Sequence, residues 1–245
     1  MKSINLSPDY IIDISGTSDG SQDKYKKDGI WYKIDGRQQE GFNEEFVSRI
    51  LSCSNLSEDQ FVKYEQIFIN GQPGCCSPDF NKSGEEDISI YRLYANTHGG
   101  DIARLLATMD MDDAMEFTMN FVKEQTGLDI REYLANVLAL DQLILNTDRH
   151  MNNIAVMRNP DTLEILGFAP IYDSGNSMFY DLTYEELSRV HLMNIKTHSF
   201  IEKEVLLLQY VKDASLVDID NRSMVPVANI VTDNPHMTVY EKRET

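Results

Sequence analysis

The chain has 245 residues, of which 40 are acidic and 22 are basic, so its formal net charge is −18 at pH 7. Apolar residues make up 42% and aromatic residues 9% of the sequence, which excludes global disorder and suffices for the core of one large domain or two small lobes. The charge argues against a binder of duplex nucleic acid, because such binding relies on Lys and Arg to neutralise phosphates, and no apolar run is long enough to span a membrane.

The N-terminal part of the chain predicts short strands and one helix. Residues 9–40 are rich in Gly, Ser, Asp and Lys around short apolar pieces, which favours strands joined by turns. Within them, residues 30–34 predict a strand after an Asp-Gly turn. Residues 42–51 have the apolar spacing of an amphipathic helix, and residues 61–69 predict another strand. Residues 71–87 contain several Gly and Pro, and we expect them to connect two lobes.

From residue 100 onward the apolar spacing is typical of helices. Helices are expected at residues 114–126, 130–145 and 200–211, with Gly127 as a stop and a hairpin formed by residues 154–157 and 163–168. The expected fold is therefore α+β with two lobes. Residues 1–80 would form a small β-rich lobe, and residues 81–245 a larger, mainly helical lobe.

The segment that follows the helix at 130–145 carries the clearest chemistry. Asp148 is followed five positions later by Asn153, and Asp173 comes twenty positions after that. An Asp and an Asn on one loop can face a substrate hydroxyl and a metal ion together, and a second Asp can complete the ligands of Mg²⁺. Each residue type is common in ordinary loops. The motif, the hairpin and the second Asp occur together in order, which favours a site for phosphoryl transfer.

The N-terminal part offers further groups for such a site. Residues 15–24 form a Gly/Ser loop whose backbone amides can hold phosphates, although such loops are also ordinary turns. Lys33 lies inside an apolar strand, where its charge needs a partner or must reach water. Glu40 and Glu44 share one face of the next helix, and either can pair with Lys33.

The cysteines predict neither a disulfide framework nor a metal site. Cys53 stands alone, Cys75 and Cys76 are adjacent, and the sequence lacks Cys and His at the spacing of zinc ligands. We therefore expect thiols in a reducing compartment.

Taken together, these motifs resemble the HipA-like branch of the protein-kinase-like fold. The chain is similar to its compact forms without an extra N-terminal subdomain, such as the CtkA-type secreted kinases or the shortened toxin of split three-gene operons. The resemblance covers roughly residues 12–210 and is most specific over residues 148–175. The same Asp-Arg-His-x-x-Asn string occurs in phosphoinositide kinases, but the rest of the chain fits HipA-like proteins better. The resemblance implies ATP contacts from these residues: Gly20, Ser21 and Gln22 of the loop, Lys33 of the strand, and Cys75, Cys76 and Ser77 of the hinge region at 74–80.

The resemblance also implies an activity, namely transfer of the γ-phosphoryl group of ATP to Ser or Thr of a protein, with Mg²⁺. Asp148 would be the catalytic aspartate, Asn153 and Asp173 the metal ligands, and Lys33 the phosphate-binding lysine, positioned by Glu40 or Glu44. Family members can autophosphorylate near the Gly/Ser loop, where the candidates here are Ser15, Thr17, Ser18 and Ser21. Arg149 would hold the loop or contact phosphate, and His150 would pack within it.

Other functions of the same site are open at this point. The acceptor could be a lipid headgroup or a small molecule, or the chain could be a catalytically silent nucleotide-binding module of a toxin-antitoxin system. The expected partners are a protein substrate and a regulator of the antitoxin type. The N-terminus has no apolar segment of the kind found in secretory signals, so we expect a cytoplasmic bacterial protein, with export by a non-Sec route left open.

Overall fold

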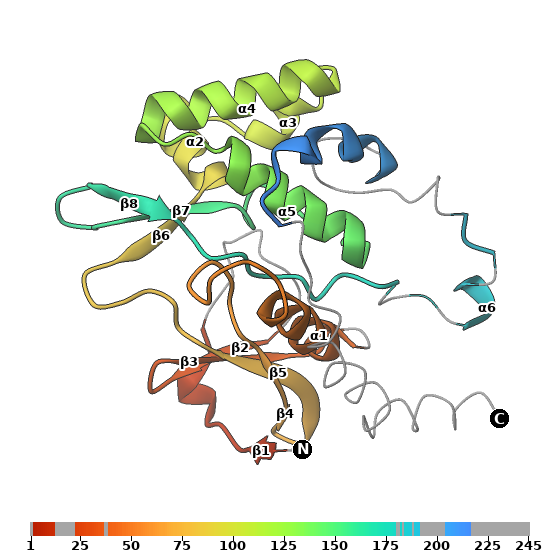
Figure 1. The fold of residues 1–245 in the computed structure, drawn as a ribbon. Helices are drawn as coiled ribbons and strands as arrows, with labels where there is room; N and C mark the ends of the chain where they lie inside the picture. Colours follow the sequence, from red (N-terminus) through yellow and green to blue (C-terminus); the bar gives the residue numbers. More distant parts are fainter. Residues whose placement is uncertain are drawn as a thin grey trace.

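The computed structural model describes residues 2–12, 23–36, 39–179, 182, 184–187, 189–191 and 204–216. An N-terminal sheet with one helix lies at one end of the molecule, and a helical region with a three-stranded sheet lies at the other (Figure 1). None of the helices formed by the described residues combines the length and apolar character of a membrane span.

The N-terminal sheet has five strands in the order β1-β4-β5-β3-β2. They are β1 (Lys2–Ile4), β2 (Lys24–Lys27), β3 (Ile30–Ile34), β4 (Glu65–Ile69) and β5 (Gln72–Pro78). Neighbouring strands are antiparallel except β1, which pairs parallel to β4. Tight turns join β2 to β3 and β4 to β5, and both turns have two residues with positive φ, Asp28-Gly29 and Asn70-Gly71. The predicted strand at 30–34 and its Asp-Gly turn are confirmed.

Two expectations about this region are wrong. The expected connector at 71–87 contains β5, which pairs with β3 on one side and β4 on the other. Its two prolines, Pro73 and Pro78, lie near the ends of the strand, where fewer ladder hydrogen bonds are lost. The expected strand at 61–69 begins only at Glu65, because Phe61 forms an isolated bridge with Ile171 instead.

Helix α1 (Glu40–Ser52) packs against β4 and β5, where the sequence predicts a helix at 42–51. The other face of the sheet is covered by the N-terminal residues, where Leu6 packs with Tyr25, Tyr32 and Ile69. A short 3₁₀ helix, η1 (Pro8–Tyr10), belongs to this cover. The sheet therefore has an α1 face and an opposite face that is closed by its own N-terminus.

The C-terminal region contains helices α2 (Ile90–His98), α3 (Ile102–Leu106), α4 (Met111–Thr126) and α5 (Arg131–Ile144). Its sheet has the order β6-β7-β8, with β6 (Glu86–Ser89), β7 (Ala155–Arg158) and β8 (Ile165–Phe168). The predicted helices at 114–126 and 130–145 and the predicted hairpin are confirmed. Gly127 ends α4 in the left-handed conformation, as its position predicts.

The last described elements are α6 (Tyr184–Leu187) and η3 (Glu204–Asp213), a 3₁₀ helix that packs against α5. The helix expected at 200–211 is thus a 3₁₀ helix over its described part, and residues 200–203 lie outside the described residues.

One apolar cluster joins the two regions. Val47 and Leu51 of α1 pack with Val137, Leu140 and Ile144 of α5, and α1 lies beside α5 in Figure 1. Leu56, Phe61 and Ile171 complete this cluster. Because the core is shared, the position of α1 is tied to the end of α5, from which the loop with Asp148 begins.

Candidate active site

Lys33, Glu44 and Asp173 form one charged cluster. The Lys33 Nζ lies 3.2 Å from Oε1 of Glu44 and 2.8 Å from Oδ1 of Asp173. Burial would lower the pKa of Lys33, but the charge of Asp173 raises it well above its ordinary value, helped by Tyr64 and Glu44. Burial would raise the pKa of Asp173, yet Lys33 and Lys24 hold it below its ordinary range. Lys33 and Asp173 are therefore both charged in the folded protein.

Two other residues shape this cluster: Tyr64, which was not selected from the sequence, and Lys24, which was expected in the Gly/Ser loop at 15–24 and is the first residue of β2. The Lys33 Nζ lies 5.3 Å from the centre of the Tyr64 ring, at a distance that allows a cation–π contact. Lys24 lies opposite Lys33 in the β2–β3 pair and contributes to the low pKa of Asp173. Asp173 has a φ of 60°, a left-handed conformation that is uncommon outside glycine and that concentrates at functional sites.

Close packing of two glycines sets the position of α1. A Cβ at Gly41 of α1 would lie 2.5 Å from the carbonyl carbon of Gly74 in β5. A Cβ at Gly74 would lie 2.2 Å from the carbonyl oxygen of Lys33. The helix can approach β5 this closely because Gly41 has no side chain, and the absence of a side chain at Gly74 lets β5 lie against the Lys33 carbonyl of β3. Asp35 also holds the start of α1, since its Oδ1 accepts a hydrogen bond of 2.7 Å from the backbone N–H of Gly41.

This placement decides which acidic residue faces Lys33. The structure pairs Lys33 with Glu44, whose other oxygen accepts a 3.0 Å hydrogen bond from the backbone N–H of Ser174. Burial raises the pKa of Glu44, with Lys33 opposing that effect. Glu40 is buried at the start of α1, and its Cβ and carbonyl oxygen lie against Gly175.

The loop after α5 carries Asp148 and is held by a set of hydrogen bonds. The Asp148 N–H donates to Oδ1 of Asn146 at 3.1 Å, and Nδ2 of Asn153 donates to the Asp148 carbonyl at 3.2 Å. Oδ2 of Asp148 accepts a 2.6 Å hydrogen bond from Nδ2 of Asn176. His150 is half-buried in the same loop, and its backbone N–H donates a hydrogen bond to the Asp148 carbonyl.

Arg149 holds this loop against the segment that carries Asp173. Its guanidinium is buried, and its Nε lies 3.0 Å from Oδ2 of Asp141 on α5. Nη1 of Arg149 contacts the carbonyls of both Asn153 and Tyr172, and Nη2 donates to Oγ of Ser174 at 3.1 Å. Of the two roles left open by the sequence, the structure therefore shows the one that holds the loop.

The loop and the Asp173 segment offer oxygen ligands of the kind that Mg²⁺ prefers. One nitrogen of Arg149 touches the carbonyls of Asn153 and of the residue before Asp173, so the two candidate ligands lie near each other. Nδ2 of Asn153 is engaged by Asp148, which leaves Oδ1 as the atom through which Asn153 would bind a cation. The donor set of Asn153 and Asp173 thus fits Mg²⁺. Among the described residues, no group of three or more His, Cys, Asp and Glu forms a different metal site.

The three residues of β5 that were expected to contact the nucleotide lie on two faces of the sheet. Cys75 pairs with Lys33 and Ser77 with Trp31, so both share the face of Lys33, and both are buried. Cys76 pairs with Tyr32 and packs with the cluster on the opposite face. The side chain of Cys76 therefore lies on the face opposite Lys33, and the nucleotide contacts of all three residues stay predictions. Successive side chains of a strand point to opposite faces of the sheet, so Cys76 faces away from its neighbours Cys75 and Ser77.

The predicted loop residues Gly20, Ser21 and Gln22 lie outside the described residues, as do the phosphorylation candidates Ser15, Thr17 and Ser18. Their roles stay predictions.

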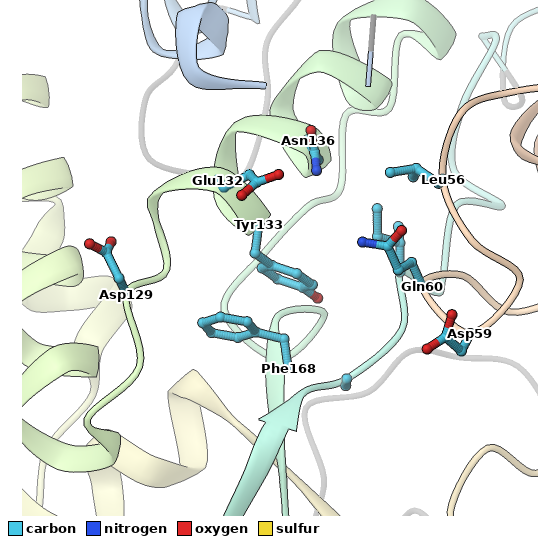
Figure 2. A pocket seen from close by; sticks show the side chains of 10 residues that line it. Leu56, Asp59, Gln60, Asp129, Glu132, Tyr133, Asn136 and Phe168 are labelled. Carbon is cyan, nitrogen blue, oxygen red and sulfur yellow. The ribbon is translucent and has the colours of Figure 1, made fainter. Parts of the chain in front are cut away.

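A separate pocket of about 330 Å³ opens between the segment after α1, the start of α5 and the end of β8 (Figure 2). The Tyr133 ring stacks on Phe168 with 4.7 Å between ring centres, and the Tyr133 hydroxyl is buried without a hydrogen-bond partner among the described residues. Asp59, Asp129 and Glu132 lie at its edges. None of the predicted site residues that the structure describes lines it.

Comparisons with known proteins complete the description. No protein-family model matches the sequence, and no curated protein matches it. Among solved structures, the chain is similar to the crystal structure of the proinflammatory kinase CtkA of Helicobacter pylori, with a TM-score of 0.54 and 16% sequence identity. The similarity covers 77% of this chain and 66% of that kinase, so this chain spans slightly less than two thirds of its length. The predicted α+β fold of the kinase-like type is thereby confirmed.

Proposed function

We propose that this protein is a kinase that uses ATP and Mg²⁺ to phosphorylate Ser or Thr side chains of a protein, including its own. The observation that carries the proposal is the Lys33–Glu44–Asp173 cluster beside a loop that presents Asp148 and Asn153. Phosphoryl transfer needs these parts, because catalysis of this reaction consists mainly of positioning and charge neutralisation. The similarity to a kinase fold supports the same reaction class.

Each residue has a defined role in this proposal. Lys33 would bind phosphate oxygens in place of the Asp173 carboxylate, while Glu44 keeps its ammonium group in position. Asn153 and Asp173 would hold Mg²⁺, which when bound neutralises charge on the phosphates. Asp148 would orient the acceptor hydroxyl and take its proton. The hydroxyl oxygen forms a bond to the γ-phosphorus, the bond from that phosphorus to the β,γ-bridging oxygen breaks, and ADP leaves with the electron pair.

The test is the intact mass of the protein after incubation with ATP and Mg²⁺, with a generic protein substrate in a parallel sample. We expect mass steps of one phosphoryl group in wild type. Asp148→Ala and Asp173→Ala should slow the transfer on the order of 10²- to 10⁴-fold. Asp161→Ala, in the exposed turn between β7 and β8, is the matched control and should behave as wild type.

Two results would overturn the proposal. Full activity of a folded Asp148→Ala variant would remove Asp148 from its role. A wild type that transfers no phosphate, yet whose melting temperature rises with ATP and Mg²⁺, would instead be a silent nucleotide-binding module or an enzyme for another acceptor.

A further inference from the structure

Asn176 contacts the carboxylate of Asp148, although no sequence motif includes it. Its Nδ2 donates a 2.6 Å hydrogen bond to Oδ2 of Asp148. An ionised carboxylate can only accept, so the contacting atom of the amide must be its nitrogen. A hydrogen bond of this length to a charged acceptor is stronger than one between neutral groups. It limits rotation of the carboxylate that would receive the substrate proton.

The backbone around Asn176 is itself held from two sides. Its carbonyl accepts from the Thr147 N–H at 3.2 Å, and the N–H of Met178 donates to the carbonyl of Ile144 at the end of α5 at 2.8 Å. The amide of Asn43, buried in α1, donates to the carbonyls that flank Asn176 in the chain, at 2.9 and 2.7 Å. The side chain of Asn176 therefore projects from a fixed backbone.

These bonds form a connection from the N-terminal region to the catalytic loop. Asn43 precedes Glu44, the partner of Lys33, in the same helix. When α1 lies where Glu44 reaches Lys33, Asn43 reaches the segment 175–177, and Asn176 reaches Asp148. The positions of the Lys33 and Asp148 side chains thus both depend on α1, through its neighbouring residues Glu44 and Asn43.

We propose that Asn176 is a positioning residue for Asp148, a role that rests on the proposed kinase function. Asn176 orients the carboxylate of Asp148 toward the acceptor hydroxyl and does not itself bind ATP. Its removal should therefore lower kcat while it leaves KM for ATP unchanged, because the interaction matters in the transition state and not in nucleotide binding.

The test compares two substitutions that differ in hydrogen bonding. Asn176→Ala removes the donor, and we expect kcat to fall about 10- to 100-fold with KM for ATP within about twofold of wild type. Asn176→Asp keeps the size and shape of the side chain but replaces the donor with a charged acceptor at 2.6 Å from the Asp148 oxygen. Repulsion should turn the Asp148 carboxylate away, so this variant should be slower than Asn176→Ala.

The order of the two variants separates positioning from packing. If Asn176 only fills space, the isosteric Asp variant should be at least as active as the Ala variant. Asn159→Ala, in the turn between β7 and β8, is the matched control and should keep wild-type kcat. Melting temperatures of all variants show whether each one folds, and Asn176→Gln, which keeps an amide donor, should recover part of the activity lost in Asn176→Ala.

Each outcome bears on the proposal. An Asp variant slower than the Ala variant, with unchanged KM for ATP, supports it. Wild-type kcat in Asn176→Ala, or an Asp variant at least as active as the Ala variant, overturns it. For the kinase function to stand, Asp148→Ala in the same assay must be slowed on the order of 10²- to 10⁴-fold. A fully active Asp148→Ala would instead overturn the proposed function itself.

Discussion

Two ion-pair systems lie on either side of the candidate site and differ in how much water reaches them. The side chains of Lys33, Glu44 and Asp173 are 13%, 3% and 32% exposed, so one end of this cluster is open to solvent. The Arg149–Asp141 pair is 1% and 2% exposed, and the guanidinium also contacts two backbone carbonyls and a serine hydroxyl. The open cluster can exchange partners with a ligand, whereas the closed pair has its donors engaged within the protein.

The same kind of interaction thus serves two purposes. A buried pair rarely adds much net stability compared with apolar residues, but loss of one partner leaves a charge without compensation. We therefore expect the Arg149–Asp141 pair to matter for folding. We expect the Lys33 cluster to matter for chemistry and less for folding, because Asp173 can be hydrated and Glu44, whose pKa burial already raises, can take up a proton.

The largest effect on stability should come from the closed pair. Arg149→Met leaves the Asp141 carboxylate buried without its cation, which should lower the free energy of unfolding by about 3–5 kcal/mol. Urea unfolding followed by circular dichroism measures this loss. The double variant Asp141→Asn with Arg149→Met buries no charge and should be more stable than Arg149→Met alone. A double variant that is less stable than the single one would contradict this account.

Substitution in the Lys33 cluster should affect the rate of phosphoryl transfer more than the free energy of unfolding. Lys33→Met should lower the rate of phosphoryl transfer on the order of 10²- to 10³-fold, the range found when a single group that stabilises transition-state charge is removed. The free energy of unfolding should fall by only about 1–2 kcal/mol. Lys26→Met is the matched control. It removes a lysine of the neighbouring strand β2 that pairs with Asp79, outside the candidate site, and the variant should transfer phosphate at the wild-type rate. Comparable stability losses in Lys33→Met and Arg149→Met would remove the distinction between the two systems.

A pH dependence of stability is also expected from a carboxyl group near Lys33. Burial raises the pKa of Asp35 to about 7, with the Gly41 hydrogen bond opposing this and Glu40 and Glu44 adding to it. The folded pKa exceeds that of the unfolded chain, near 3.9. The folded state therefore binds more protons between these values, and the free energy of unfolding decreases as pH rises through this window toward 7 and just above.

Urea unfolding at pH 5 and pH 8 measures this dependence. Asp35→Asn cannot titrate at this position, so it should lose much of the decrease between the two pH values. The same decrease in Asp35→Asn and wild type would assign it to other groups.

Local patterns predicted those parts of the fold in which neighbours in sequence are neighbours in space. The apolar spacing at 114–126 and the stop at Gly127 correspond to α4, and the turn residues at 28–29 join β2 to β3. The connector expected at 71–87 shows the limit. Its Gly and Pro residues favour a loop, but β5 forms because β3 and β4, distant in sequence, pair with it on both sides.

In the candidate site, too, the sequence predicted the residues of local motifs but not those that act through contacts between distant segments. Asp148, Asn153 and Asp173 were selectable from the sequence because they belong to one short ordered motif, and Lys33 because a charge inside an apolar strand needs a partner. Tyr64, Asp141 and Asn176 carried no comparable signal. Their roles arise from contacts between segments far apart in the chain, such as the 28 positions between Asp148 and Asn176.

Patterns among nearby residues were enough to predict most of the elements and the residue types that could carry phosphoryl transfer, because helix and strand periods and short motifs depend on near neighbours in the chain. Which partners meet depends on packing between distant segments. Glu44 and not Glu40 pairs with Lys33, since the close contact of Gly41 with Gly74 sets the position of α1 on the sheet. The register of β5 turns Cys75 toward Lys33 and Cys76 away from it. Burial of Arg149 makes it a support of the loop, because only the folded core excludes water from its guanidinium.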